Sequence, residues 1–505
     1  MSEKNANTTL SPAAQQHLAQ GQAALAAHNL VTALEAFQQA AALAPDSEPV
    51  LAALGQLAME AADWVAAERI LRRADTLYAG RHRARLALAI FNQQRYADAL
   101  PLLEQIGADG NIDENCALAW SRCLEKCGQQ DRSVRLMTQI YQGTKSERNA
   151  VLLMSVLLRL GRRRELDEWM PKLLADWPQN AQLLAGRSEH GFLSGDYATG
   201  FEYMHHRWAL SLEKPKGAQL PCPAWDGRRF DGTLLVTAEQ GLGDQVLASS
   251  VYEELVRIGQ PALIDCDARL LPLYRRSFPS LQFADRKSDA LERAARDPAA
   301  RKIDGLELGR YFRRDIDRMP ERISWLVADP QQVAHWRDWL ATNFPGRRAI
   351  GVSWRSARAL LGDSKSIPVT DLAPLLSHDD FVCVSLQYGD IAPDLSQLGA
   401  AGLVLQVAPG LDCTEDIDGL CALIAALDAV VTCSNTTAHL AGGLGSPTRV
   451  MIPGSRYVLW YWGHDGERAP WYRSLRLFRG PPRRDWRALA GDVAADLTRT
   501  LAIRP

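Results

Sequence analysis

The sequence predicts an α + α/β protein, with an N-terminal all-α solenoid followed by two α/β domains. A pattern of small and apolar residues recurs about every 34 residues through the first 210 positions. From residue 232 onward, short β-branched runs alternate with amphipathic stretches, which is typical of parallel sheets with crossover helices. A chain of 505 residues is too long for one hydrophobic core, so several domains are expected.

The repeat pattern is most regular near the N-terminus. The first repeat fills the positions of the tetratricopeptide pattern with Gly21, Ala24, Ala33, Phe37, Ala40 and Pro45. The position of Ala33 recurs, in steps of 34, 32, 34, 33 and 34, at Ala67, Ala99, Ser133, Leu166 and Gly200. Small residues let antiparallel helices cross closely, so we expect a tetratricopeptide (TPR) solenoid of about six hairpins over residues 1–210. Its groove would grip a peptide or protein; the alternative is that it only braces the chain.

The remaining segments are assigned from turn residues and apolar runs. SLEKPKGAQLPCPAWDG is rich in proline and glycine and predicts a linker over residues 211–231. A first Rossmann-like domain is expected over 232–345, with strands in TLLVTA, PALID and LQF and helices near 245–258 and 267–276.

A second Rossmann-like domain is expected over 346–490, with strands in RAIGVSW, FVCVSLQ, LVLQV, AVVTC and TRVMI. The helix in HWRDWLATNFPGR is interpreted as the hinge between the two domains. A C-terminal helix within 491–505 is expected to brace both. Two doubly wound domains in tandem place the carboxyl ends of their strands across a shared cleft, where ligands bind.

Composition excludes several classes of protein. The 57 basic residues are balanced by 59 acidic ones, so nucleic acid is not expected as a partner. The N-terminus lacks the order of a secretory signal, and the apolar run from Val151 to Leu160 is shorter than the ~20 residues of a transmembrane helix. Nine scattered cysteines predict reduced thiols, and Cys116, Cys123 and Cys127 are interpreted as buried side chains rather than metal ligands. A cytoplasmic protein without a transmembrane segment is expected.

Three loops at predicted strand ends carry candidate site residues. In AEQGLGDQ, Gly241 and Gly243 allow a sharp turn into a helix whose N-terminus faces the cleft, with Gln240 beside them. Asp244 at the helix start is a candidate general base that takes a proton from a hydroxyl. The alternatives are a purely structural turn and a carboxylate that only partners the helix N-terminus.

The second loop follows GVSW and contains two cations. Arg355 and Lys365 bracket a turn with glycine and serine, and Trp354 stands at the end of the strand. Two cations near a strand end suit a diphosphate, whose developing charge they would stabilise. The alternative is a solvated basic loop.

The third loop is SNTTAHLAGGLG. Asn435, Thr436 and Thr437 are expected to cap a helix and to present hydroxyl and N–H groups to an anion. His439 either serves this site or is a half-buried histidine with its hydrogen bonds satisfied.

These motifs carry a family resemblance. AEQGLGDQ, GVSW with a later SKSIP, VSLQYGD and SNTTAHLAGGLGSP closely resemble the C-terminal half of bacterial glycosyltransferases that fuse TPR repeats to a GT-B pair of Rossmann-like domains. This half is similar, more distantly, to the ADP-heptose lipopolysaccharide heptosyltransferases. The fusion is also similar to that of protein O-GlcNAc transferases and flagellin glycosyltransferases. GDYATGFEYMHHRW, PAWDG and PWYRSLRLFRGPPRRDW extend the resemblance over nearly the whole chain.

The resemblance implies roles for single positions. Asp244 matches the acceptor base of the heptosyltransferases, and Lys365 falls near their lysine that contacts the donor phosphates. Asn435 stands where that family has an aspartate facing the donor sugar, so heptose becomes a doubtful donor. Gln387 and Tyr388 are implied candidates for the wall around the nucleotide base.

Such folds do not need a metal bound by a DxD motif, so no metal and no cofactor are expected beyond the nucleotide-sugar co-substrate. The DCD and DID sequences are interpreted as strand-end or loop carboxylates. We expect a positively lined cleft and a single, inverting displacement at the anomeric carbon. Asp244, with His439 as second choice, would accept the proton, while Arg355, Lys365 and the helix start at Thr436–Thr437 hold the phosphates.

The leading hypothesis is therefore a cytoplasmic glycosyltransferase that modifies serine or threonine of a protein acceptor recruited by the TPR groove, with flagellin as a candidate. One alternative is an enzyme acting on lipopolysaccharide or a lipid-linked glycan. Another is a non-catalytic TPR scaffold with a degenerate GT-B half, which the departure at Asn435 favours. The aromatic stretch YVLWYWGHDGERAPWY forms either a lip over the acceptor or a buried contact.

Overall fold

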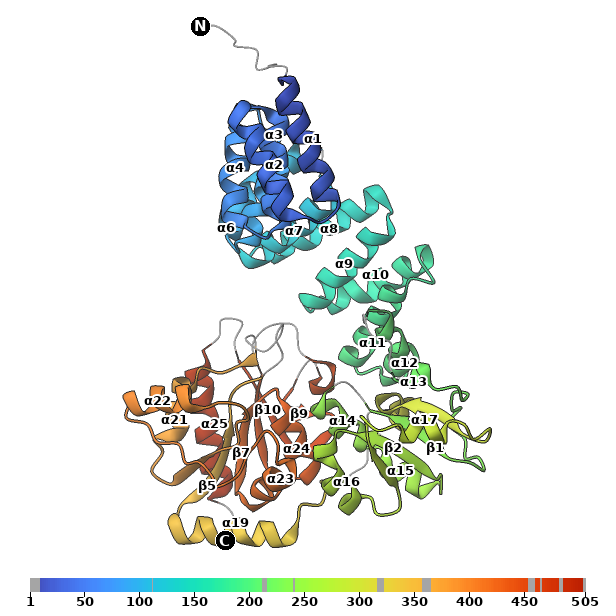
Figure 1. Ribbon diagram of the computed structural model, residues 1–505. Helices are drawn as coiled ribbons and strands as arrows, with labels where there is room; N and C mark the ends of the chain where they lie inside the picture. Colours follow the sequence, from blue (N-terminus) through green and yellow to red (C-terminus); the bar gives the residue numbers. More distant parts are fainter. Residues whose placement is uncertain are drawn as a thin grey trace. The chain divides into compact units, whose positions relative to one another are not determined.

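The computed structural model describes residues 10–110, 112–210, 216–238, 241–315, 322–356, 365–452, 459–463, 466–480 and 485–502. Its contacts divide the chain into two compact units, Met1–Glu165 and Leu166–Pro505 (Figure 1). The described helices include none with the length and apolar character needed to span a membrane.

The first unit consists of helices in the predicted 34-residue register. They are α1 (Pro12–Ala26), α2 (Leu30–Leu43), α3 (Glu48–Glu60), α4 (Trp64–Leu77), α5 (Arg83–Asn92), α6 (Tyr96–Ala108), α7 (Glu114–Lys126), α8 (Gln130–Thr144), α9 (Glu147–Arg159) and the start of α10 (Arg163–Asp176). Consecutive helices pack as hairpins, from α1 with α2 to α7 with α8. The register continues into the second unit as α11 (Ala181–Ser194) and α12 (Tyr197–Tyr203). The predicted TPR-like region is confirmed.

Close helix crossing explains the small residues of the repeat. A Cβ atom on Gly21 would lie 2.4 Å from a ring carbon of Phe37, and one on Gly55 would lie 2.6 Å from the Cδ2 atom of Leu71. Each pair lies within one helical hairpin, and the two pairs occupy equivalent positions of adjacent repeats. The register positions found in the sequence are all buried: Ala33, Ala67, Ala99, Ser133, Leu166 and Gly200.

The turns between paired helices follow the same register. A left-handed residue stands in each at His28, Ala62, Gln94, Gly128, Gly161 and Gly195. These positions repeat the steps of the buried series, although half of them are not glycine. Glycine adopts this conformation at little cost and other residues pay on the order of 1 kcal/mol, so the turn is imposed by helix packing and not by the residue type.

The second unit contains two sheets (Figure 1). The first has the order β3-β2-β1-β4, with all strands parallel: β1 (Leu234–Thr237), β2 (Ala262–Cys266), β3 (Gln282–Asp285) and β4 (Arg301–Asp304). All four residues of β1 are buried, as expected for a central strand covered on both faces. The associated helices are α13 (Lys216–Gln219), α14 (Leu242–Ser249), α15 (Tyr252–Arg257), α16 (Leu271–Ser277), α17 (Ala290–Ala294) and α18 (Gly309–Phe312).

The second sheet has the order β6-β5-β7-β8-β10-β9. Its strands are β5 (Arg348–Ser353), β6 (Phe381–Ser385), β7 (Ala429–Cys433), β8 (Thr448–Ile452), β9 (Arg468–Ala469) and β10 (Tyr472–Arg479), and β9 runs antiparallel to the rest. Its helices are α19 (Pro330–Asn343), α21 (Ala373–Leu376), α22 (Ala392–Ala400), α23 (Ile417–Ala426), α24 (Thr436–Leu444) and α25 (Trp486–Leu501). The predicted fold class, a TPR-like region followed in the chain by a pair of Rossmann-like α/β folds, is thus confirmed.

Several elements differ from the sequence expectation. LVLQV makes only one bridge, between Val384 and Gln406, because Val404 and Val407 are 64% and 48% exposed. β4 and β10 are missed by the sequence analysis, because lysine and arginine interrupt their apolar alternation. The helix expected over 245–258 is two helices, α14 and α15, and the one expected over 267–276 starts only at Leu271.

Two connecting segments also differ. Residues 216–231, expected as a linker, pack on the first sheet, where Leu220 and Cys222 join its core and the N–H of Trp225 donates to the carbonyl of Lys302 at 2.9 Å. The C-terminal helix α25 begins earlier than expected. Its apolar face, which includes Val493, packs in the core of the second sheet rather than bracing both domains.

The α11–α12 hairpin is joined to the α/β part by aromatic side chains. Phe192 stacks on Trp460 with ring centroids 4.3 Å apart. Tyr197 and Phe201 meet the ring of Trp471 edge-on, at 5.9 and 6.2 Å. Both tryptophans are partly buried, so at these positions the aromatic stretch is a packing contact rather than a lip over the acceptor.

Candidate active site

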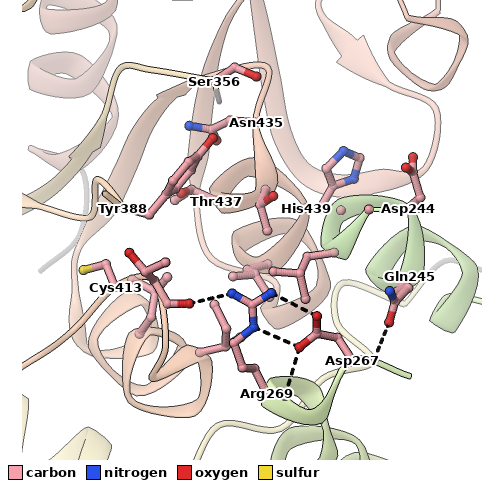
Figure 2. Close-up of a pocket in the computed structure, with 18 of the residues that line it drawn as sticks. Asp244, Gln245, Asp267, Arg269, Ser356, Tyr388, Cys413, Asn435, Thr437 and His439 are labelled. Carbon is pink, nitrogen blue, oxygen red and sulfur yellow. Dashed lines mark hydrogen bonds and ion pairs between the residues drawn. The ribbon is translucent and has the colours of Figure 1, made fainter. Parts of the chain in front are cut away.

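A cavity of about 610 Å³ lies at the carboxyl ends of strands from both sheets (Figure 2). The residues lining it include Gly241–Gln245 after β1, Asp267 and Arg269 after β2, Ser356 and Lys365 after β5, Tyr388 after β6, and Ser434–Thr437 and His439 after β7. Loops at this edge of parallel sheets are where α/β folds bind ligands. The three predicted loops therefore meet at one cavity.

The start of α14, after β1, contains two glycines. Gly241 is the N-cap residue and offers no side-chain cap, and Asp244 lies in the first turn of the helix. A Cβ on Gly241 would lie 3.1 Å from the Oδ2 atom of Asp244, and one on Gly243 would lie 2.8 Å from the Cδ2 atom of His439. The helix N-terminus favours the ionised form of a carboxylate placed there. Gln240 lies outside the described residues.

The turn from β7 into α24 is held by the side chain of Asn435. Its Oδ1 atom accepts hydrogen bonds from the Ala438 N–H at 3.4 Å and from the Thr432 hydroxyl at 2.9 Å. Its Nδ2 atom donates to the Ser353 hydroxyl at 2.8 Å and to the Arg355 carbonyl at 3.1 Å. A carboxylate has no hydrogen to donate to that carbonyl, so an amide at this position has a structural reason.

The first residues of α24 face the cavity. Thr436 is half-buried, and the buried Thr437 donates its hydroxyl to Ser353 at 3.3 Å. Both line the cavity together with Ser434, whose hydroxyl accepts a hydrogen bond from the Trp462 indole at 2.8 Å. A helix N-terminus with adjacent hydroxyls is suited to an anion.

Only one of the two predicted cations lines the cavity. Lys365 does, and its side chain is largely buried, with the residue 8% exposed. The Arg355 guanidinium instead donates to the Asp390 carbonyl at 2.7 Å and pairs with the Asp394 carboxylate at 3.1 Å. Arg355 thus contributes its backbone to the site, and its charge is neutralised by α22.

Gln387 and Trp354 lie beneath the cavity rather than in its lining. The Oε1 atom of Gln387 accepts hydrogen bonds from the backbone N–H of Trp354 at 2.9 Å and of Arg355 at 2.7 Å, and from the Ser353 hydroxyl at 3.1 Å. Trp354 is buried in the core of the second sheet. Tyr388 lines the cavity. The implied wall of the nucleotide base is therefore reduced to Tyr388, and Gln387 fixes the end of β5.

His439 is a neutral imidazole. It is 3% exposed, and burial, aided by the charge of Lys365, lowers its pKa to about 3. Its Nδ1 atom lies 2.6 Å from the Tyr472 hydroxyl, and its ring stacks on Trp462 at 5.2 Å. A conjugate acid with such a low pKa makes a weak base, so Asp244 is the better candidate for proton acceptance.

Sequence reasoning misses an ion pair in the lining. Arg269 binds the Asp267 carboxylate through Nε at 2.8 Å and Nη2 at 2.9 Å, and donates to the Thr414 carbonyl at 2.9 Å (Figure 2). The Arg269 hydrogen bond is the main cause that lowers the pKa of Asp267. The cationic Lys365 and Arg269 are balanced by Asp244 and Asp267 in the described lining, so the expected positive lining is not found there. The arginine two residues after the DCD sequence is the signal that could have found this pair.

The described residues hold no group of three or more His, Cys, Asp or Glu side chains arranged for a metal ion. In the DCD sequence, Asp265 is buried and pairs with Lys216 at 3.1 Å, and its carboxylate accepts the N–H of Ala238. Burial raises the pKa of Asp265, against the effect of Lys216. This carboxylate therefore holds the ends of β1 and β2 together.

Comparison with known proteins gives one long match. No family model matches the chain. It is 28% identical to Protein FlbA of Caulobacter vibrioides over 514 residues, which covers 93% of this chain and 81% of that protein. Among solved structures, E. coli ADP-heptose lipopolysaccharide heptosyltransferase II matches at 16% identity and a TM-score of 0.37, covering 53% of this chain and 99% of that one. MamA from Desulfovibrio magneticus RS-1 matches at 15% identity and a TM-score of 0.32, covering 34% and 99%. The chain is thus similar to FlbA over most of its length, and its own helices and strands form a TPR-like region and a GT-B-like pair of sheets.

Proposed function

We propose that the protein is a glycosyltransferase that moves a sugar from a nucleotide-sugar donor to a serine or threonine hydroxyl of a protein acceptor. The observation that carries this proposal is the meeting of Asp244, Lys365 and the N-terminus of α24 at one cavity between two sheets. A base, a cation and an anion-binding helix end are the parts that such a transfer needs.

The donor diphosphate binds at the second sheet. The first turn of α24 supplies backbone N–H groups and the Thr436 hydroxyl as donors, Thr437 lines the same cavity, and Lys365 supplies a positive charge. These groups stabilise the negative charge that develops on the diphosphate as its bond to the sugar breaks. Tyr388 lines the same cavity, and we assign it the contact with the nucleotide base.

The acceptor is activated at the first sheet. Asp244 takes the proton of the acceptor hydroxyl while the oxygen of that hydroxyl attacks the anomeric carbon. The nucleoside diphosphate departs from the opposite face of this carbon. One displacement inverts the configuration at that carbon. His439 does not take part as a base, since the low pKa of its conjugate acid makes the buried imidazole a weak proton acceptor.

A protein acceptor is supported by the repeats. Within the first unit, a groove of about 600 Å³ is lined by apolar side chains such as Leu88 and Phe91 together with Arg85, Asn92 and Asn115. Mixed apolar and hydrogen-bonding linings suit an extended polypeptide, whose backbone offers donors and acceptors along its length.

The test is a transfer assay with the purified full chain, a panel of nucleotide sugars, and flagellin as the first candidate acceptor. Nucleotide release together with an acceptor mass increment equal to one sugar is expected, and a chelator should leave the rate unchanged. A product that forms only with a lipid-linked glycan would replace the protein acceptor. If no nucleotide sugar is bound or consumed by the folded protein, it is a scaffold and the proposal fails.

A further inference from the structure

His439 is enclosed on three sides by groups that fix its ring. Trp462 stacks on it with an interplanar angle of 28°, and Tyr461 meets it edge-on with centroids 4.8 Å apart. The backbone of Gly243 approaches the third side closely, since a Cβ there would lie 3.3 Å from Nε2 and 2.8 Å from Cδ2 of His439. The Nε2 edge of the ring therefore lies toward the start of α14, beside the cavity that both residues line (Figure 2).

The opposite edge of the ring meets Tyr472, which lies on β10. The Tyr472 hydroxyl is 2.6 Å from Nδ1, and the tyrosine is 1% exposed. In the part of the chain that the structure describes, Nδ1 is the hydrogen-bond partner recorded for this hydroxyl. A buried O–H without an acceptor costs more than an unused lone pair, so the phenol donates its hydrogen to Nδ1.

This direction determines the state of the imidazole. A neutral imidazole carries one hydrogen, and a nitrogen that accepts a hydrogen bond cannot carry it. The hydrogen is therefore on Nε2, which makes that edge a donor.

The charged groups around the ring agree with a neutral donor. Lys365 lines the same cavity and disfavours a second positive charge on His439. Asp244 at the start of α14 lines the same cavity, and Tyr461 and Tyr472 contact the ring edge-on. Lys365 and the Nε2–H group of His439 are thus two hydrogen-bond donors at one cavity. Because the imidazole is neutral, the two groups do not repel each other as two positive charges would.

We propose that Tyr472 is a positioning residue that holds His439 in the Nε2–H tautomer, so that His439 donates a neutral hydrogen bond to a phosphate oxygen of the bound donor. The inference rests on the proposed function for the identity of that anion. It assigns proton acceptance to Asp244 alone, and no proton moves to or from His439.

The tautomer is tested on the ligand-free full chain by nitrogen NMR of protein labelled with ¹⁵N-histidine. The His439 signals, assigned by their loss in His439→Gln, should show a pyrrole-type Nε2 and a pyridine-type Nδ1 that do not titrate between pH 5 and 8. An imidazolium, or hydrogen on Nδ1, would overturn the inference. Because the measurement needs no substrate, its outcome is independent of the proposed transferase activity.

Variants of Tyr472 test the role of the His439 hydrogen bond in transfer. Tyr472→Phe should give mixed tautomers and lower kcat about tenfold, the size of one hydrogen bond, with less effect on KM. Tyr274→Phe, which removes another fully buried tyrosine hydroxyl on α16, is the matched control and should leave tautomer and kcat unchanged.

The side-chain amide of glutamine can donate from a position similar to Nε2 but cannot act as a base. His439→Gln should therefore keep at least tenfold more activity than His439→Ala. Equal loss in both variants, with folding intact, would instead make His439 a base and contradict the inference. If no variant and no wild-type protein binds a nucleotide sugar, the proposed function fails while the NMR result stands.

Discussion

The two strand-to-helix turns of the cavity are built in opposite ways. The turn into α24 is capped by Asn435, whose amide joins β5 and β7 through Ser353 and Arg355. The turn into α14 begins at Gly241, which provides no side-chain cap. Among the described residues, the start of α24 has a side-chain cap and the start of α14 has none.

Because of this difference, we expect substitutions at the two turns to have different effects, on protein stability at one and on transfer rate at the other. Asn435 of the α24 turn uses its amide on neighbouring residues of the second sheet, so changes at Asn435 should mainly cost stability. Asp244 of the α14 turn lies half-buried on the cavity, so changes there should mainly cost rate. His439 connects the two turns, since it lies on α24 and packs against Gly243.

The largest effect is expected at Asp244. Asp244→Asn should lower the transfer rate about 1000-fold, because the amide cannot accept the proton of the acceptor. Donor affinity should stay within about threefold, and the free energy of unfolding within about 0.5 kcal/mol, as for a change outside the core. Steady-state kinetics measure the transfer rate and the effect on the donor, and chemical denaturation measures the free energy of unfolding. Retained transfer would make Asp244 only a charge partner of the helix end.

At the other turn, Asn435→Ala should lower the free energy of unfolding by about 2–3 kcal/mol, because it removes a cap and leaves buried partners unsatisfied. Asp485→Ala is the matched control in the same unit. It removes an exposed cap whose side chain accepts from the Ala488 N–H at 2.9 Å, and should cost about 1 kcal/mol. Equal losses in chemical denaturation would show that the Asn435 network adds nothing beyond a cap.

The connection through His439 predicts a pH dependence of stability. Its pKa is lowered from 6.5 to about 3 in the folded protein, so the unfolded state binds the proton more tightly. Stability is full above pH 6.5 and falls by about 1.4 kcal/mol per pH unit toward pH 3. Relative to wild type, His439→Gln should therefore gain about 2 kcal/mol on going from pH 7 to pH 5. His205 and His206, whose pKa values are also lowered by burial, are common to both proteins. Parallel pH profiles would place His439 in a solvated, protonatable state.

Much of the fold follows from patterns in the chain. The 34-residue register gives the helices because every repeat must bury the same face against its neighbours. The central strands β1, β5 and β7 are continuous apolar runs. β4 and β10 are hidden because their arginines and lysine lie at sheet edges or form ion pairs, as Arg476 does with Glu467 at 2.7 Å. Such pairing depends on tertiary neighbours that the local pattern does not contain.

The loops that form the site could be predicted from the sequence, but the directions of their side chains could not. The sequence indicates which loops follow strands, and these loops do meet at the cavity. It does not indicate that Arg355 turns toward Asp394, or that Arg269 turns into the cavity, because long side chains choose among partners set by the fold. The role of Asn435 likewise requires knowing that β5 and β7 are neighbours.

The most direct test of the account is calorimetric titration of the full chain with UDP, ADP and GDP. One of these nucleotides should bind, Lys365→Met should weaken its binding at least tenfold, and Arg355→Met should change it less than twofold, because Lys365 lines the cavity and the Arg355 side chain does not. Absence of binding by the folded wild-type protein, or equal losses in the two variants, would contradict the assignment of this cavity to a nucleotide-linked donor.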